Sequence, residues 1–181
     1  LSAHKFHGPK GIGLLFAKSS IQLTSLIRGG GQERGKRAGT ENLPGIIGLA
    51  AALKDAQENM QQNTAYITGL RDALRNGLDK IDGAGFNGSR EHCLPGTVNY
   101  SFQGVNGETL LSLLSNEGIC CSSGSACSAG SLEPSHVLLA LGLSHETAQS
   151  ALRFSLCEYN TMDEVQTIIT KVTEAVNRLR R

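Results

Sequence analysis

The chain has 181 residues, of which 39% are hydrophobic and 18% are charged. This length and composition suit one globular domain, or a small domain with part of another. The formal net charge is only +1, so no large electrostatic field favours nucleic acid or an anionic membrane as a partner. No apolar run is long enough to span a bilayer, and no signal peptide opens the chain.

The chain carries five cysteines, which are Cys93, Cys120, Cys121, Cys127 and Cys157. An odd number without a secretory segment argues against a disulfide framework, and no Cys/His spacing indicates a zinc site. We therefore expect reduced thiols in a cytoplasmic protein with no bound metal. Cys120 and Cys121 are expected to be buried structural cysteines.

The first 60 residues predict a strand, a loop and a helix. The apolar run "GIGLLFA" (11–17) follows a loop rich in glycine and proline and predicts a buried strand. Residues 28–42, "RGGGQERGKRAGTEN", form a glycine-rich basic loop. A helix is expected over about 43–60. The proline at its second position is compatible with this helix, because proline is tolerated in a first helical turn.

The middle of the chain alternates between helix and strand. An amphipathic helix is expected where apolar residues recur every four positions, at Tyr66, Leu70, Leu74 and Leu78. "TVNYSF" (97–102) alternates apolar with polar residues, as a half-buried strand does. Next comes a helix that Asn106 caps and Gly118 ends. "ICC" (119–121) predicts another strand.

The last third opens on the serine- and glycine-rich stretch "SSGSACSAGSLEPS" (122–135). Two short helices follow, one opened by Pro134 and one capped by Ser144. "LRFSL" (152–156) alternates as a strand does, and "TMDE" (161–164) is a capping box. The apolar stripe of the final helix consists of Val165, Ile168, Ile169, Val172, Val176 and Leu179. This order predicts an α+β unit in which helices cover one face of a small sheet.

A first candidate site is the loop "SAHKFHGPKG" (2–11), which glycine and proline constrain. Lysine forms Schiff bases once its amine is partly desolvated, and pyridoxal phosphate uses such a lysine as its anchor. A solvated surface lysine is the alternative. Spacing alone does not choose between Lys5 and Lys10.

A second candidate is the loop "GGGQERGKRAGT" (29–40). Consecutive glycines let backbone N–H groups converge on an anion, and Arg34, Lys36, Arg37 and Thr40 add charge and a hydroxyl. It is not a Walker A sequence. A flexible basic turn explains the composition equally well.

The third candidate combines Cys127 with Arg153. A thiol in an exposed serine- and glycine-rich stretch can act as a nucleophile, and a guanidinium on the polar side of a strand suits bidentate binding of a carboxylate. The alternatives are an inert loop cysteine and a surface salt bridge.

Four motifs together resemble a known family. "SAHKFHGPKGIG", "GGGQERGKRAGTEN", "SSGSAC" followed by "SLEPSHVLLALG", and "LRFSL" are similar to the C-terminal half of NifS/IscS-like cysteine desulfurases. These are class V enzymes of fold type I that depend on pyridoxal phosphate. The similarity covers essentially the whole chain, with the motifs in the family's order and spacing.

The resemblance implies roles in holding the cofactor. Lys5 matches the Schiff-base lysine, and Ser2 and His4 match residues that hold the phosphate of pyridoxal phosphate. Thr40 resembles the threonine that reaches the phosphate of the neighbouring subunit, which implies a homodimer.

The resemblance also implies the reaction. Cys127 matches the nucleophile that takes the substrate sulfur and becomes a persulfide, and Arg153 matches the arginine that binds the substrate carboxylate. The expected activity converts L-cysteine to L-alanine and passes sulfur to an acceptor or iron–sulfur scaffold protein. The stretch 122–135 resembles the long mobile cysteine loop of this branch, whose serines and glycines let the thiol move between substrate and acceptor.

The implied fold is an α/β enzyme, of which this chain holds the small C-terminal α+β domain and the last portion of the large cofactor-binding domain. We expect that portion in residues 1–42, a connecting helix in 43–60 and the small domain in 61–181. Family members carry a long segment before the lysine motif, which adds cofactor contacts. Because the chain begins at Leu1 rather than Met, we expect its true N-terminus to lie elsewhere, and we expect the isolated chain to bind cofactor weakly or not at all.

Two other functions stay open from the sequence. One is a related pyridoxal phosphate enzyme that resembles selenocysteine lyase. The other is a non-catalytic module for dimerisation or acceptor binding, in which Cys127 is a docking or redox thiol and Lys5 is incidental.

Overall fold

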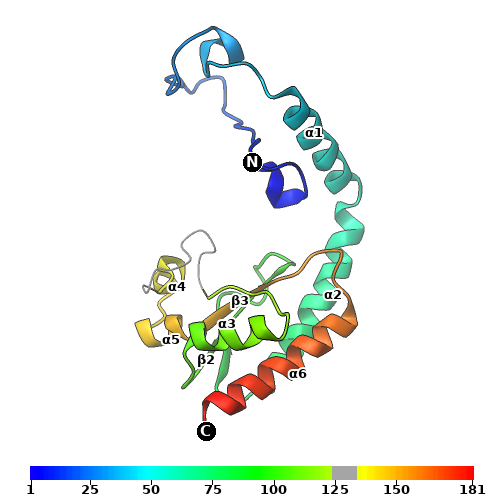
Figure 1. Cartoon of the computed structure of the whole chain (residues 1–181), viewed down its shortest axis with the longest axis vertical. Coiled ribbons are helices and arrows are strands. Elements are labelled where there is room, and N and C mark those ends of the chain that lie inside the picture. Colours follow the sequence, from blue (N-terminus) through cyan, green and yellow to red (C-terminus); the bar gives the residue numbers. More distant parts are fainter. Residues whose placement is uncertain (124–133) are drawn as a thin grey trace. The chain divides into compact units, whose positions relative to one another are not determined.

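A computed structural model of the chain describes residues 1–123 and 134–181. The chain divides into two compact units, Leu1–Gln61 and Gln62–Arg181, and each is considered by itself. Figure 1 shows their elements in chain order.

The first unit consists of loops, two short 3-10 turns and one helix. The turns are η1 (Ala3–Phe6) and η2 (Gln32–Gly35), and the helix is α1 (Leu43–Glu58). The Asn42 side chain caps α1 by accepting a hydrogen bond from the Gly45 N–H at 3.1 Å. The helix predicted over about 43–60 is therefore present, and it ends two residues early.

The strand predicted over residues 11–17 is wrong. This segment has no regular structure apart from one isolated bridge between Ser2 and Gly13, and the Phe16 side chain is 82% exposed. A strand needs a hydrogen-bonded neighbour. Among the described residues no strand lies beside this run, and Leu14, Leu15 and Phe16 are exposed.

The second unit is built on a three-stranded antiparallel sheet in the order β1-β2-β3. The strands are β1 (Ala84–Phe86), β2 (Thr97–Phe102) and β3 (Ala151–Ser155). Tyr100 pairs with Leu152 across β2 and β3. The alternation predicted for β2 and β3 is confirmed, whereas β1 was not predicted.

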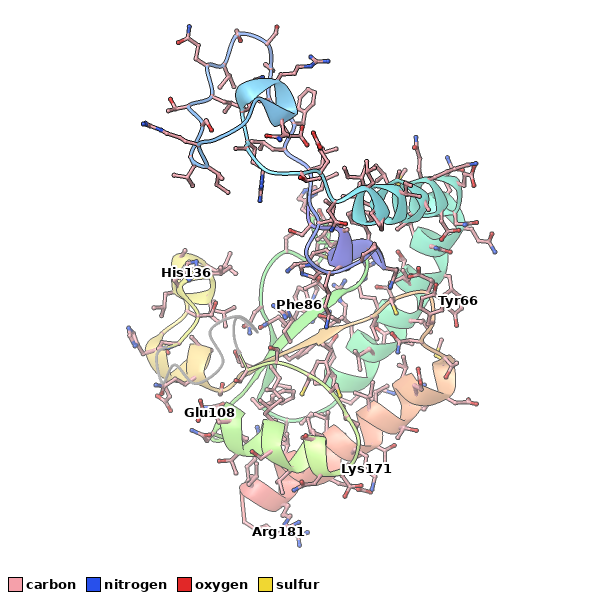
Figure 2. All side chains as sticks on the ribbon, turned by 45° about the horizontal axis from the view of Figure 1, so that its top comes forward. Tyr66, Phe86, Glu108, His136, Lys171 and Arg181 are labelled. Carbon is pink, nitrogen blue, oxygen red and sulfur yellow. The ribbon has the colours of Figure 1, made fainter. Side chains whose placement is uncertain are left out.

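Three helices cover one face of this sheet: α2 (Met60–Leu78), α3 (Gly107–Asn116) and α6 (Met162–Leu179). Figure 2 marks Tyr66 on α2, Glu108 in the first turn of α3 and Lys171 on α6. The side chains fully buried between these helices and the sheet include Leu70, Leu74, Leu78, Val98, Tyr100, Phe102, Leu110, Leu114, Leu152, Val165, Val172 and Val176. Burying such side chains is the main stabilising contribution to the unit, at roughly 1.5–3 kcal/mol for each large aliphatic group.

The opposite face of the sheet carries polar side chains and two short helices, α4 (His136–Ala140) and α5 (His145–Gln149). The Ser101 hydroxyl of β2 donates a hydrogen bond to the Thr147 carbonyl of α5 at 2.9 Å. Leu138, Ala148 and Ala151 form a small apolar cluster there. The helix that the sequence placed after Ser144 is confirmed, because the Ser144 hydroxyl accepts from the Thr147 N–H at 3.2 Å.

The capping box at the start of α6 is also confirmed. The Glu164 N–H donates to the Thr161 hydroxyl at 3.2 Å, and the Thr161 N–H donates to the Glu164 carboxylate at 2.9 Å. That second bond, together with one from Asn160, holds the pKa of Glu164 below its usual value.

The strand predicted at residues 119–121 is wrong. Only Ser122, just beyond it, makes a bridge, and its partner is Arg153. Ile119 is buried, while Cys120 is exposed and Cys121 is half-buried. The prediction that both cysteines are buried is therefore wrong for Cys120. Within the described part of the chain, no helix has the length and apolar composition needed to cross a membrane.

Candidate cofactor and substrate site

The loop that carries Lys5 is closed by its own backbone. The Leu14 N–H donates to the Leu1 carbonyl at 2.9 Å, and the Ala3 N–H donates to the Ile12 carbonyl at 3.1 Å. Residues 1–14 therefore form a closed loop, which we call the lysine loop.

Inside the lysine loop, Lys5 lies in the turn η1, whose geometry is set by three further features. The Lys5 N–H donates to the Ser2 carbonyl at 3.0 Å, and the Gly8 N–H donates to the Ala3 carbonyl at 2.9 Å. His7 ends the turn in the left-handed region at φ 65°, a conformation uncommon outside glycine.

The side chains of Ser2, His4 and Lys5 are exposed, so a ligand can reach all three. Their chemistry fits pyridoxal phosphate: a primary amine for its aldehyde, and a hydroxyl and an imidazole in the same turn as donors for its phosphate. Lys10 is exposed as well, so exposure does not distinguish the two lysines.

The glycine-rich loop has the backbone strain expected of a specialised turn. Glu33 and Arg34 both adopt left-handed conformations, at φ 51° and 57°, and non-glycine residues in this region cluster at functional sites. The Gln32 carboxamide accepts from the Gly39 N–H at 3.2 Å and so closes the turn. Thr40 is exposed two residues before the α1 cap.

Arg153 lies on the polar face of β3, opposite Asn99 of β2. Its backbone N–H donates to the Ser122 carbonyl at 2.7 Å, and its own carbonyl accepts from the Ser122 N–H at 3.0 Å. The side chain is half-buried, and no carboxylate of the described residues pairs with it. The salt bridge offered as an alternative thus does not occur in the described part of the chain, and the guanidinium can bind a ligand carboxylate.

Cys127 lies outside the described residues, so the structure does not place it. Of the described cysteines, Cys121 is a poor nucleophile. Burial raises the pKa of its thiol to about 11, and the neighbouring Cys120 adds to the shift. The reactive species of cysteine is the thiolate, and Cys121 is almost entirely protonated at neutral pH.

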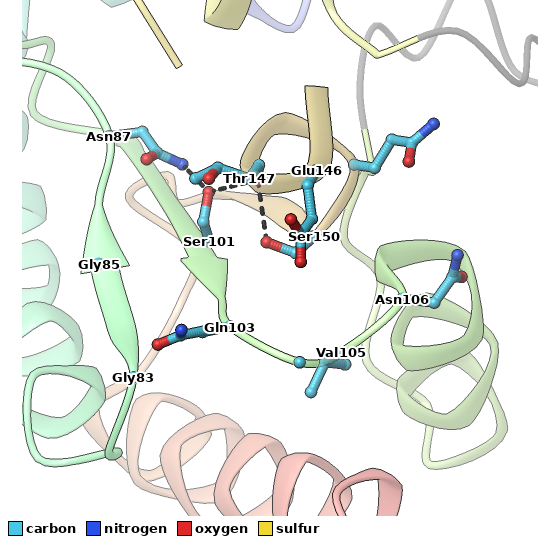
Figure 3. Close-up of a pocket in the computed structure, with 12 residues that line it drawn as sticks. Gly83, Gly85, Asn87, Ser101, Gln103, Val105, Asn106, Glu146, Thr147 and Ser150 are labelled. Carbon is cyan, nitrogen blue, oxygen red and sulfur yellow. Dashed lines mark hydrogen bonds between the residues drawn. The ribbon is translucent and has the colours of Figure 1, made fainter. Parts of the chain in front are cut away.

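A pocket of about 510 Å³ lies on the polar face of the sheet (Figure 3). The Asn87 amide donates to the Ser101 hydroxyl at 2.8 Å, and Ser101 in turn donates to the Thr147 carbonyl. This pocket was not predicted from the sequence. The glycines that line it are the one weak indication of it in the sequence. None of the predicted site residues lines it, so it is not the site to which the four motifs point.

The pattern of the aminotransferase class-V family matches residues 1–168, and the chain belongs to this family. Cysteine desulfurase IscS of Clostridium botulinum is 46% identical over 183 residues, which are 99% of this chain and 46% of that protein. A cysteine desulfurase of Gluconacetobacter diazotrophicus is 45% identical over 181 residues, which are 99% of this chain and 45% of that protein.

Solved structures give the same result. A NifS-like protein superposes with a TM-score of 0.87 at 41% identity, covering 98% of this chain and 45% of that one. Cysteine desulfurase CsdA from Escherichia coli superposes with a TM-score of 0.73 at 26% identity, covering 98% and 45%. The chain therefore spans about half the length of the curated relatives and solved structures that it matches.

Proposed function

We propose that this chain is the C-terminal part of a cysteine desulfurase that converts L-cysteine to L-alanine and transfers the sulfur to Cys127. The C–S bond of the substrate breaks, a proton replaces sulfur at carbon, and a new S–S bond forms. L-cysteine and a thiol thus become L-alanine and a persulfide. The observation that carries the proposal is the lysine loop, which presents an exposed amine, hydroxyl and imidazole on one turn.

Lys5 holds the cofactor covalently, and Ser2 and His4 hold its phosphate. Pyridoxal phosphate, when bound, supplies the electron sink. Thr40 reaches the phosphate of a second copy's cofactor, so the working protein is a homodimer. The exposure of Thr40 beside a strained basic turn supports this assignment.

Arg153 binds the carboxylate of L-cysteine. The support is its place on a strand and the lack of a carboxylate partner within the described residues. A guanidinium fixed by a backbone bridge keeps its orientation, and bidentate binding depends on orientation. A structural relative, SspA, has been solved in complex with cysteine; it is 34% identical and superposes with a TM-score of 0.59, covering 88% of this chain and 44% of that one.

Cys127 accepts the sulfur as a persulfide, a reversible modification that is reset when an acceptor takes the sulfur. The acceptor is a protein of iron–sulfur cluster or thiocofactor assembly in the cytoplasm. The elevated pKa of Cys121 supports the choice of Cys127 over this neighbour.

The first test is borohydride reduction of the protein that carries this sequence, loaded with pyridoxal phosphate, followed by peptide mapping. The expected result is one pyridoxyl label, on Lys5, that Lys5→Ala removes. Lys10→Ala is the matched control, because it removes an exposed amine from the same loop, and it should leave the label unchanged. A label that survives Lys5→Ala would refute the assignment.

The second test measures alanine formation. Cys127→Ala should abolish sulfur transfer, and Arg153→Lys should raise KM for L-cysteine more than it lowers kcat. If selenocysteine is processed and cysteine is spared, the protein is instead a selenocysteine lyase-like enzyme. If Cys127→Ala leaves the biological role intact, the non-catalytic reading holds.

A further inference from the structure

The lysine loop packs directly on helix α1 at a position where the helix has no side chain. A Cβ atom placed on Gly48 would lie 2.5 Å from Cγ and 3.0 Å from Cδ of Pro9. Glycine is unfavourable inside a helix, and at position 48 its missing side chain leaves the room that the Pro9 ring fills.

Pro9 cannot move aside easily. Its ring closes on the backbone nitrogen and fixes φ, so Cδ, which would lie 3.0 Å from the added Cβ, shifts only if the loop backbone shifts. An ordinary contact at Gly48 requires 3.4–4 Å, and an added methyl group therefore pushes the loop outward by about 1 Å.

That displacement is transmitted through close contacts to the turn that carries Lys5. Gly8, next to Pro9, donates its N–H to the Ala3 carbonyl, and a Cβ on Gly8 would lie 2.8 Å from the Ala3 Cβ. Ala3 is fully buried and begins η1. Pro9, Gly8 and Ala3 therefore form one close-packed series that ends at the lysine turn.

The other end of the loop is equally tight. A Cβ on Gly13 would lie 2.7 Å from the Leu1 carbonyl oxygen, and the bridge between Ser2 and Gly13 closes the loop there. The backbone hydrogen bonds from the Ala3 and Leu14 N–H groups that join the two ends oppose opening of the loop, so a push on Pro9 displaces the turn as well.

We infer that Gly48 is a positioning residue for Lys5, and that it acts through the contact of the Pro9 ring with the α1 backbone. The inference deepens the proposed function, because it rests on that proposal for the role of Lys5. The packing itself is a property of the chain without cofactor and can be measured separately.

The experiment uses the cofactor-loaded protein and the same protein stripped of cofactor. The variants are Gly48→Ala, Pro9→Ala and the double variant. Gly69→Ala is the matched control, because Gly69 is also inside a helix but a Cβ there meets nothing within 4 Å. In the double variant only Cβ of residue 9 remains, and it lies 4.0 Å from the new methyl group, so the clash is gone.

In the cofactor-free protein, Gly48→Ala should speed amide hydrogen exchange across residues 1–14, and the double variant should return it toward the wild-type rate. In the loaded protein, Gly48→Ala should lower kcat by about 10- to 100-fold, since a misplacement of about 1 Å costs on that order. KM for L-cysteine should change less than about twofold by the same reasoning, because Arg153 is untouched. Gly69→Ala should change neither.

The inference is overturned if Gly48→Ala behaves like Gly69→Ala, or if the double variant is no better than Gly48→Ala. Should Gly48→Ala fail to fold, Pro9→Ala decides: it removes the ring atoms that contact Gly48 and puts no methyl group in their place, as the double variant does, so unchanged exchange and unchanged kcat in it would also overturn the inference. Failure of the proposed function is distinguishable, because it would remove the Lys5 label from the wild-type protein while leaving the exchange result intact.

Discussion

The hydroxyl of Tyr100 offers a sharp test of how the sheet is held to its helices. Its ring is fully buried and meets the Phe86 ring edge-on at a centroid distance of 5.5 Å. The hydroxyl donates to Asp79 Oδ1 at 2.7 Å, and burial raises the pKa of Tyr100. Two N–H groups of Arg90 bind the same carboxylate, at 2.8 and 2.7 Å.

Tyr100→Phe removes this charge-assisted hydrogen bond without removing the ring. Such bonds contribute about 1.5–3 kcal/mol. Asp79 keeps Arg90, and its side chain is 35% exposed, so water replaces the lost donor and the low end applies. We expect the free energy of unfolding to fall by about 1.5 kcal/mol and Tm to fall by roughly 3–6 °C.

The free energy of unfolding that Tyr100→Phe removes should depend on pH. Hydrogen bonding to Arg90 lowers the pKa of Asp79, and Tyr100 lowers it further. A carboxylate whose folded pKa is depressed contributes stability above its unfolded pKa, and this contribution is lost as pH falls through the folded value. The difference between wild type and Tyr100→Phe should therefore be full at neutral pH and shrink steadily below about pH 4.

The assay is urea unfolding at a series of pH values, with Tyr66→Phe as the control. The Tyr66 hydroxyl donates to the Asn160 carbonyl at 2.7 Å, but Tyr66 is 45% exposed, so its loss should cost less than about 0.5 kcal/mol. A Tyr100→Phe cost no larger than that of Tyr66→Phe, or one that is the same at pH 3 and pH 7, would refute the reasoning.

Three smaller predictions concern the packing of the second unit. Leu74→Ala should lower the free energy of unfolding by about 3 kcal/mol, seen as a lower urea midpoint, because the side chain is fully buried; a cost under about 1 kcal/mol would contradict this. Thr161→Ala should cost about 1 kcal/mol in thermal unfolding, because it removes the hydroxyl that accepts from the Glu164 N–H; an unchanged Tm would contradict this. Gly77→Ala should cost about 1–2 kcal/mol, since its Cβ would overlap the Ile169 side chain, and adding Ile169→Val should recover part of the loss.

The helices and long strands of the second unit could be predicted because periodicity maps directly onto burial. Leu70, Leu74 and Leu78 recur on one side of α2 and are all at most 1% exposed. The strand β1 could not be predicted, because "AGF" is short and includes glycine. It exists because β2 provides a hydrogen-bonding edge, which is a tertiary effect.

The two wrong strands share a cause. Residues 11–17 and 119–121 are short apolar runs, and a short apolar run does not by itself indicate whether a neighbouring strand is available to pair with it. Arg153 was placed correctly on the polar face, since alternation fixes the faces of a strand once its register is known. Spacing could not separate Lys5 from Lys10, and both are exposed; the resemblance alone made that choice.

The two units differ in what holds them together, and this difference makes a last prediction. Of the hydrophobic residues in Leu1–Gln61, only Ala3, Ala38 and Leu49 are buried, while Phe16 is 82% and Leu26 is 95% exposed. Backbone hydrogen bonds and close glycine contacts hold the lysine loop, whereas a side-chain core holds the second unit.

Global unfolding should therefore report mainly the second unit, because regions with few buried apolar contacts open locally at lower free energy. Gly48→Ala should leave the main urea transition within about 0.5 kcal/mol of wild type while it speeds exchange in residues 1–14. Leu74→Ala should do the reverse, lowering the transition with little local effect on that loop. If both variants shift the same transition equally, the lysine loop and the core unfold as one cooperative unit, and the separation of site geometry from stability fails.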